Sequence, residues 1–386
     1  MNAAPTLPSG PAGAGPALDA DGARDPETEV LRLVSRPRLA PPHAEALAAR
    51  IREGVDWDRL LALATDHRLL PLLYAHLRDH AQADADAPTL ALLRQAALRR
   101  AADVAFLSSE MAAIGERFAR DGIPYLVLKG PTLSEAYGSN GLRPYSDNDL
   151  LVRRRDFPSV EAALLGMGFR QRKRSDRQQS AYLAIHGEYT FGRADGPFVS
   201  TVDVHTRLVP MGFEFSPSFD DVASRSRAIE VAGRPVPVLS WEDLFLALSV
   251  NALKDQWSHL RLAADLAAVS EMVGDWGEVR ARARAGRHRR GLLLSVLVTE
   301  RLVGGGFPPD LVRAAQADRR AVRLADLACA HLGVAGLDQP LSLLDRSRLN
   351  VSVQDGAVPA LRYVLYTALR RTLGVIVTPP GKAKAT

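Results

Sequence analysis

The strongest constraint on the fold lies between residues 125 and 152, where two short apolar runs flank a turn and a polar loop. The first run, Tyr125-Leu126-Val127-Leu128, is typical of a short buried strand, and Lys129-Gly130 ends it. Pro131 follows where the first residue of a helix tolerates a missing N–H. The order predicts a strand, a turn, a short helix over 132–137, a loop and a second strand beginning near Leu150.

Two carboxylates stand at the start of the second strand. Asp147 and Asp149 are two residues apart, so their side chains point to the same face if the strand already includes them. Carboxylates on one face repel each other unless a cation lies between them, and a divalent metal with oxygen ligands is the usual answer. Read alone, Asp147 could instead be a turn residue before the strand.

Hydrophobic periodicity divides the remaining chain into helical blocks on either side of a strand-rich block. We therefore expect an α+β protein, in which a small mixed sheet with helices follows an N-terminal helical segment and precedes an all-helical C-terminal domain. The expected boundaries are a disordered extension over 1–28, the helical region 29–120, the sheet-containing core 121–239, the helical domain 240–375 and a disordered tail over 376–386. Within the C-terminal part we expect helices over 276–302, 309–334 and 357–373 and an irregular stretch over 340–356, and a loop is expected over 173–180.

The charge of the chain is mildly basic, at +5 with a pI near 9.5. A nucleic-acid partner is not favoured, because only five of the 49 basic residues are lysine and the chain is rich in Ala, Gly and Pro, which is typical of a GC-rich genome. In such a chain Lys129 and Lys254 stand out, since a compact ammonium contacts a phosphate differently from a planar guanidinium.

Several classes of protein are excluded by what the sequence lacks. Cys329 is the single cysteine, so neither an intramolecular disulfide nor a cysteine zinc site is possible. The N-terminal stretch has no signal-peptide pattern and no apolar run reaches the length of a membrane span, so we expect a cytoplasmic protein without a membrane partner.

An ordered set of motifs resembles a known family. The set comprises Leu128-Lys129-Gly130, Arg143, Ser146-Asp147-x-Asp149-Leu150-Leu151-Val152 and Val202-Asp203-x-His205. It resembles the bacterial nucleotidyltransferase family proteins of the polymerase-beta-like nucleotidyltransferase superfamily, with Lys-Gly where the wider superfamily has Gly-Ser. The resemblance covers roughly residues 100 to 275.

The resemblance implies roles for the acidic residues. Asp147 and Asp149 are expected to hold Mg²⁺, and Asp203 is expected to be the third carboxylate, which also helps to deprotonate the attacking hydroxyl. Asp203 could instead be a half-exposed residue of an alternating strand. His205 lies on the same face as Asp203 by the two-residue period, where it could orient substrate or Asp203, or pack under the sheet.

Further residues are candidates for binding the nucleotide. Gly130 is expected near the phosphates at the start of the Pro131 helix, and Lys129 is expected either to contact a phosphate or to pair with the acidic cluster. Arg143 is a candidate phosphate ligand. Helices after Ser240 resemble those that line the nucleotide cleft in the family, and they supply Lys254 and Asp265; Asp265 could alternatively pair with Arg261, four residues before it.

The expected reaction follows from the resemblance. An enzyme of this kind moves a nucleoside monophosphate from an NTP to an acceptor hydroxyl or phosphate, with Mg²⁺ as cofactor and pyrophosphate as product. The acceptor could be a small molecule, a peptide or protein, or an RNA end. Two alternatives stay open: a non-catalytic nucleotide- or partner-binding protein that retains the fold, and a toxin–antitoxin-type enzyme that modifies a protein or tRNA.

Overall fold

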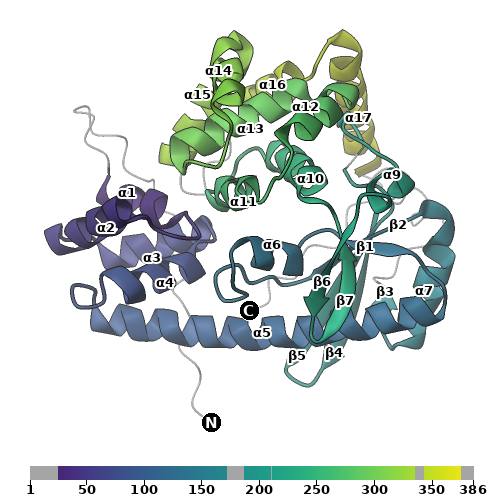
Figure 1. Ribbon diagram of the computed structural model, residues 1–386, viewed down its shortest axis with the longest axis horizontal. Helices are drawn as coiled ribbons and strands as arrows, with labels where there is room; N and C mark the ends of the chain where they lie inside the picture. Colours follow the sequence, from purple (N-terminus) through teal and green to yellow (C-terminus); the bar gives the residue numbers. More distant parts are fainter. Residues whose placement is uncertain (1–24, 172–186, 210, 335–342, 375–386) are drawn as a thin grey trace.

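The computed structural model describes residues 25–171, 187–209, 211–334 and 343–374, and its fold is α+β (Figure 1). The N-terminal helices form one group, the mixed sheet lies at the other end of the molecule, and the C-terminal helices lie across both. Helix α5 runs beneath the N-terminal helices and the sheet, so it connects the two groups (Figure 1). The predicted fold class is confirmed.

Aspartates begin several N-terminal helices. Asp25, Asp56 and Asp86 each accept a hydrogen bond from the backbone N–H three residues later, which satisfies a donor that the first turn leaves unpaired. The sequence predicted that the helical region begins at residue 29. The Asp25 cap makes the first helix begin earlier, at Pro26. These helices are α1 Pro26–Val34, α2 Pro41–Glu53, α3 Trp57–Asp66, α4 Leu70–His80 and α5 Ala87–Arg120.

The sheet has the strand order β3-β4-β5-β2-β1-β7-β6 in the part of the chain that the structure describes. Strand β2 runs parallel to β5, and β1 runs parallel to β7, while the other neighbours are antiparallel. The strands are β1 Tyr125–Val127, β2 Asn148–Val152, β3 Arg170–Gln171, β4 Glu188–Asp195, β5 Phe198–His205, β6 Arg227–Val231 and β7 Arg234–Val238. Helix α6 Pro131–Ala136 follows β1, and α7 Phe157–Gly166 follows β2 after the short 3-10 turn η1 Arg154–Asp156.

The two faces of the sheet serve different purposes. Val127, Leu150 and Val202 belong to a buried cluster that also contains residues of α5 and α7, so these two helices cover one face. Side chains alternate along a strand, so Asp149 and Asp203 point to the opposite face. That face lies toward the C-terminal helices α10 Trp241–Lys254 and α11 Arg261–Ser270.

The hairpin β6–β7 and helix α16 Leu343–Ser352 were not predicted. Strand β7 contains Pro235 and Pro237, residues that lack an N–H and are unfavourable within a sheet, yet it pairs with β6 along its length and with β1 at Val238. Helix α16 replaces most of the irregular stretch expected over 340–356.

The expected helices 276–302 and 309–334 are each divided in two. The remaining helices are α9 Phe219–Ala223, α12 Trp276–Ala285, α13 Arg289–Leu302, α14 Pro309–Ala317, α15 Arg319–Val334 and α17 Ala357–Gly374. The loop expected over 173–180, the tail over 376–386 and residues 1–24 of the expected extension lie outside the described residues.

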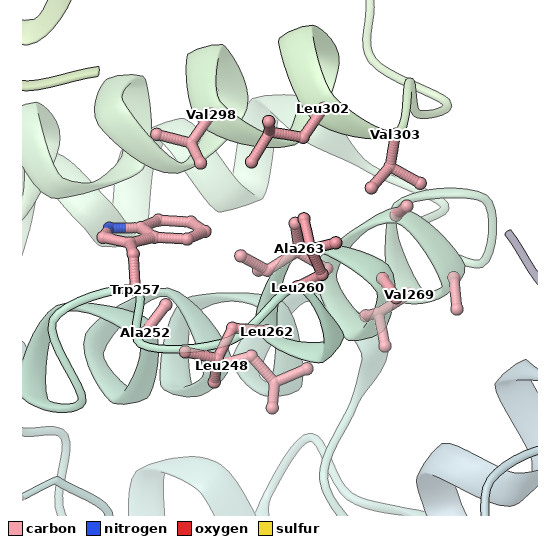
Figure 2. Close-up of a cluster of buried hydrophobic side chains, with 14 of the residues drawn as sticks. Leu248, Ala252, Trp257, Leu260, Leu262, Ala263, Val269, Val298, Leu302 and Val303 are labelled. Atoms are coloured by element: carbon pink, nitrogen blue, oxygen red, sulfur yellow. The ribbon is translucent and has the colours of Figure 1, made fainter. Parts of the chain in front are cut away.

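The helical groups share one apolar core, which includes residues from α1–α4 and from α10–α15. Trp257, in the loop between α10 and α11, is fully buried in it. Its ring points toward Val298 of α13, with Leu302 farther along the same helix (Figure 2). Within the described ranges, every helix is too short or too polar to cross a membrane.

Candidate active site

A cavity of about 510 Å³ lies between the sheet and the helices α10 and α11. Asp149 and Asp203 occupy the same register position on the parallel strands β2 and β5, so their side chains are neighbours on one face. Asp147, two residues before Asp149, lines the same cavity. The three carboxylates that the sequence predicted therefore lie together at the sheet wall of this cavity.

Asp149 is held in an ionic network. His205 Nε2 lies 2.9 Å from Asp149 Oδ1, and the carboxyl is 9% exposed. Burial opposes its negative charge, but Lys129 and His205 outweigh burial and hold the pKa of Asp149 well below its usual range. Burial likewise opposes a charge on His205, but the hydrogen bond to Asp149 raises the pKa of His205. His205 therefore orients Asp149, whereas the sequence had suggested substrate or Asp203.

The other two carboxyls are easier to protonate. Burial and the nearby Asp149 raise the pKa of Asp147. Burial, reinforced by Glu188 and Asp149, raises the pKa of Asp203 to about 6. The Oδ1 atom of Asp203 is buried and has no hydrogen-bond partner among the residues described. A buried carboxylate oxygen without a donor is costly, so this atom is available to a ligand that brings positive charge.

The acidic residues do not form a complete metal cage by themselves. Nowhere in the described ranges do three His, Cys, Asp or Glu side chains come together in an arrangement that could hold an ion. Mg²⁺ takes several of its ligands from water and from substrate phosphates, so a partial set of carboxylates is compatible with it.

Two lysines contribute positive charge at the same end of the cavity. Lys129 lies two residues after the end of β1. Burial opposes its charge, but Asp149, Asp255 and Asp147 raise the pKa of its ammonium. Lys254, at the end of α10, lies 3.8 Å from Asp255 Oδ1 and also lines the cavity. Both lysines singled out by the sequence therefore lie at this site.

Gly130 makes the turn between β1 and α6. Its φ is +63°, which a residue with a Cβ rarely adopts, and a Cβ there would come within 3.2 Å of the Tyr145 ring. The Tyr145 hydroxyl lies 2.7 Å from Ser108 Oγ on α5. The glycine therefore allows the turn to pack against the loop that carries Asp147.

Arg143 and Asp265 bind each other. Arg143 Nε and Nη2 donate to the two carboxylate oxygens of Asp265 at 2.7 and 2.8 Å, and the Tyr137 hydroxyl donates to Oδ1 at 2.9 Å. Both charged side chains are less than 10% exposed. The alternative partner proposed for Asp265, Arg261, is not the one it pairs with. The pair joins the loop before Asp147 to helix α11.

Two contributors to the site, Glu188 and Asn148, were missed at the sequence level. Glu188 is paired with His205 across β4 and β5, and its Oε2 lies 3.9 Å from His205 Nδ1. Asn148, between the two aspartates, is fully buried and donates from Nδ2 to the Leu107 carbonyl of α5 at 3.1 Å. Asp255, which follows Lys254, also lines the cavity and helps to raise the pKa of Lys129. The alternation of β2 was a signal for Asn148, but Glu188 becomes apparent only when the strands are assembled.

The chain was compared with proteins of known structure and with curated proteins. Among solved structures, the antibiotic-resistance factor ANT(2'')-Ia matches at 18% identity over 46% of this chain and 88% of its own, with a TM-score of 0.31. A nucleotidyltransferase-like antigenic protein from Paracoccidioides brasiliensis matches at 14% identity over 55% of this chain and 92% of its own, with a TM-score of 0.33. No curated protein matches.

The family model described as uncharacterised nucleotidyltransferase matches residues 53–304, a range that contains the described strands, both lysines and the carboxylates of the cavity. The chain therefore belongs to this family and is a nucleotidyltransferase.

Proposed function

We propose that the protein transfers a nucleoside monophosphate from an NTP to an acceptor hydroxyl or phosphate and releases pyrophosphate. The observation that carries the proposal is the register of Asp149 and Asp203 on adjacent parallel strands, with Asp147 on the same wall of the cavity. An NTP donor also fits the cytoplasmic location expected from the sequence.

Asp147, Asp149 and Asp203 are the residues that would hold Mg²⁺. Two observations support this fit. The Oδ1 of Asp203 is buried and has no partner among the described residues, and the pKa values of Asp147 and Asp203 are raised in part by neighbouring carboxyls. A bound cation would give the oxygen a partner and offset the repulsion between the carboxylates. When bound, Mg²⁺ supplies Lewis-acid stabilisation of charge on phosphoryl oxygens.

The chain's own side chains supply the remaining functions. Asp203 would accept the proton of the acceptor hydroxyl, because its Oδ1 has no hydrogen-bond partner among the described residues and its side chain lines the cavity. Lys129 and Lys254 contact the phosphates as compact cations. His205 keeps Asp149 ionised and fixed in direction.

The test is isothermal titration of the purified protein with ATP, GTP, CTP and UTP, with and without Mg²⁺. Asp147→Asn is the sharpest variant, since Asp147 makes no hydrogen bond or ion pair within the described structure and its loss leaves the Asp149–His205 contact intact. Asp58→Asn, at an exposed position on α3 away from the cavity, is the matched control.

We expect the wild type and the Asp58→Asn control to bind at least one NTP in a Mg²⁺-dependent manner, and Asp147→Asn to bind it at least about tenfold more weakly. The proposal fails if the folded wild type binds no NTP in the presence of Mg²⁺. It also fails if Asp147→Asn binds as tightly as the control.

A further inference from the structure

Two loops that are far apart in the sequence meet at the cavity. His67, at the end of α3, accepts a hydrogen bond at Nδ1 from the backbone N–H of Leu260, at a distance of 3.2 Å in a buried position. The contact holds the α3–α4 loop against the α10–α11 loop. As a result, Arg68 from the first loop lies near His259 from the second loop and near Arg261, the first residue of α11, and all three line the cavity.

The α10–α11 loop is anchored from below. Trp257 is fully buried, and Figure 2 shows its ring directed toward Val298 of α13. Gln256 and Trp257 have φ values of +56° and +52°, and Arg68 in the facing loop has +59°. Non-glycine residues in this region cost about 1 kcal/mol or more each, so core packing holds both loops in an otherwise unfavourable backbone conformation.

The two arginines are not neutralised by the protein. In the described part of the chain, the guanidinium group of neither Arg68 nor Arg261 has a hydrogen-bonding or ion-pair partner. The nearest buried acid, Asp265, is already paired with Arg143. Burial and the neighbouring Arg143 lower the pKa of Arg261 to about 10, which still leaves it charged at neutral pH. Two positive charges thus face the cavity without compensation.

His259 is a second, independent sign of a ligand. It is 4% exposed and lines the cavity, and its Nδ1 is buried without a partner among the residues that the structure describes. Burial, with Arg68 and Arg261 nearby, lowers the pKa of His259 to about 3, so its imidazole is neutral and carries one N–H. A buried polar group without a partner is uncommon, and here it lies beside two unpaired cations.

We propose that Arg68, His259 and Arg261 form a binding site for a phosphate group on the helical wall of the cavity, opposite in charge to the carboxylates on the sheet wall. The inference rests on the proposed function, since the phosphate belongs to one of the two substrates of that reaction. Guanidinium groups match phosphate oxygens with paired N–H donors, and two of them balance a dianion. The phosphate comes either from the polyphosphate of the NTP or from a phosphate-bearing acceptor.

The test uses inorganic pyrophosphate as the probe, titrated into the full chain in the presence of EDTA, so that the metal-dependent site does not contribute. The variants are Arg68→Gln, Arg261→Gln and the conservative Arg261→Lys. Arg94→Gln, at an exposed position on α5 outside the cavity, is the matched control, and thermal unfolding verifies that each variant is folded.

We expect Arg68→Gln and Arg261→Gln each to weaken pyrophosphate binding by at least about tenfold, and Arg261→Lys to weaken it less because the charge is kept. Raising the salt concentration should weaken binding to the wild type and to the control. The inference is overturned if the wild type binds no pyrophosphate, or if the two glutamine variants bind it as the Arg94→Gln control does.

A competition titration identifies the source of the phosphate. If saturating Mg·ATP prevents pyrophosphate binding, the site holds the phosphates of the nucleotide; if pyrophosphate still binds to the Mg·ATP complex, the site holds the phosphate of the acceptor. Each result supports the site when the arginine dependence holds.

The two proposals fail in different ways. Arginine-dependent pyrophosphate binding without Mg²⁺-dependent NTP binding leaves the phosphate site and removes the proposed reaction. If NTP binding needs Asp147 but the arginine variants bind pyrophosphate normally, the proposed reaction stands and the phosphate site is removed.

Discussion

Asp265→Asn tests whether the Arg143–Asp265 pair is a structural unit. Asp265 is 5% exposed, and its two oxygens accept hydrogen bonds from Arg143 Nε, Arg143 Nη2 and the Tyr137 hydroxyl. An amide of the same shape replaces one oxygen with a donor, so at least one hydrogen bond becomes a contact between two donors. Arg143, itself 8% exposed, then keeps its charge without a counter-ion.

The expected loss is large. Removing one partner of a buried ion pair costs about 3–5 kcal/mol, because the remaining charge is left uncompensated. We therefore expect Asp265→Asn to lower the free energy of unfolding by about 3 kcal/mol, and Arg143→Met to do the same. The double variant Arg143→Met/Asp265→Leu should lose much less than the two single losses combined, since no unpaired charge remains.

Urea-induced unfolding at pH 7.5 of the wild type, the single variants Arg143→Met and Asp265→Leu, and the double variant gives the coupling energy of the pair. We expect a coupling energy of about 2 kcal/mol or more. Single losses that add up to the double loss within about 0.5 kcal/mol would refute the reasoning, because independent sites behave in that way.

Two further predictions concern pH. Asp203→Asn should raise the free energy of unfolding in EDTA at pH 7.5 by about 2 kcal/mol. The pKa of the Asp203 carboxyl is about 6 in the folded protein and about 4 in the unfolded chain, so this carboxyl destabilises the fold as the pH rises from 4 to 6. The gain should fall by at least half at pH 4.5, and a variant no more stable than wild type at pH 7.5 would contradict the reasoning. His288 is 6% exposed, and burial lowers its pKa to about 4. Between pH 6.5 and pH 4 this histidine is therefore protonated in the unfolded chain and neutral in the folded protein. The loss of stability between pH 7 and pH 5 should therefore be smaller by about 2 kcal/mol in His288→Gln than in the wild type, and an unchanged pH dependence would contradict the burial argument.

The sequence predicted the part of the site that depends on local pattern. The two-residue period placed Asp149 and Asp203 on the face opposite the valines of their own strands, and the strands are where it indicated. Pro131 marked the start of α6 because a missing N–H is harmless in the first turn.

The parts that depend on assembly were not predictable. Glu188 reaches the site only because β4 pairs with β5 in one register, and the Arg143–Asp265 pair spans 122 residues of chain. Arg68 and Arg261 gave no signal in so arginine-rich a sequence, since what distinguishes them is the lack of a partner within the described structure. Strand β7 contains two prolines, which are unfavourable in a strand because they lack an N–H. Local propensity does not reveal that this segment pairs along its length with β6 and with β1 only at Val238.

In β2 one face contributes to the core and the other to the site, so different changes to this strand affect folding and activity to different extents. Inserting one residue into this strand would exchange its two faces, placing Asp149 against α5 and α7 and Leu150 in the cavity, and the core would be lost together with the site. Replacing Asp149 by a neutral residue, in contrast, leaves the apolar face untouched. Single substitutions can therefore silence such an enzyme while its architecture survives, and this provides a short evolutionary path from a catalyst to a folded protein that only binds.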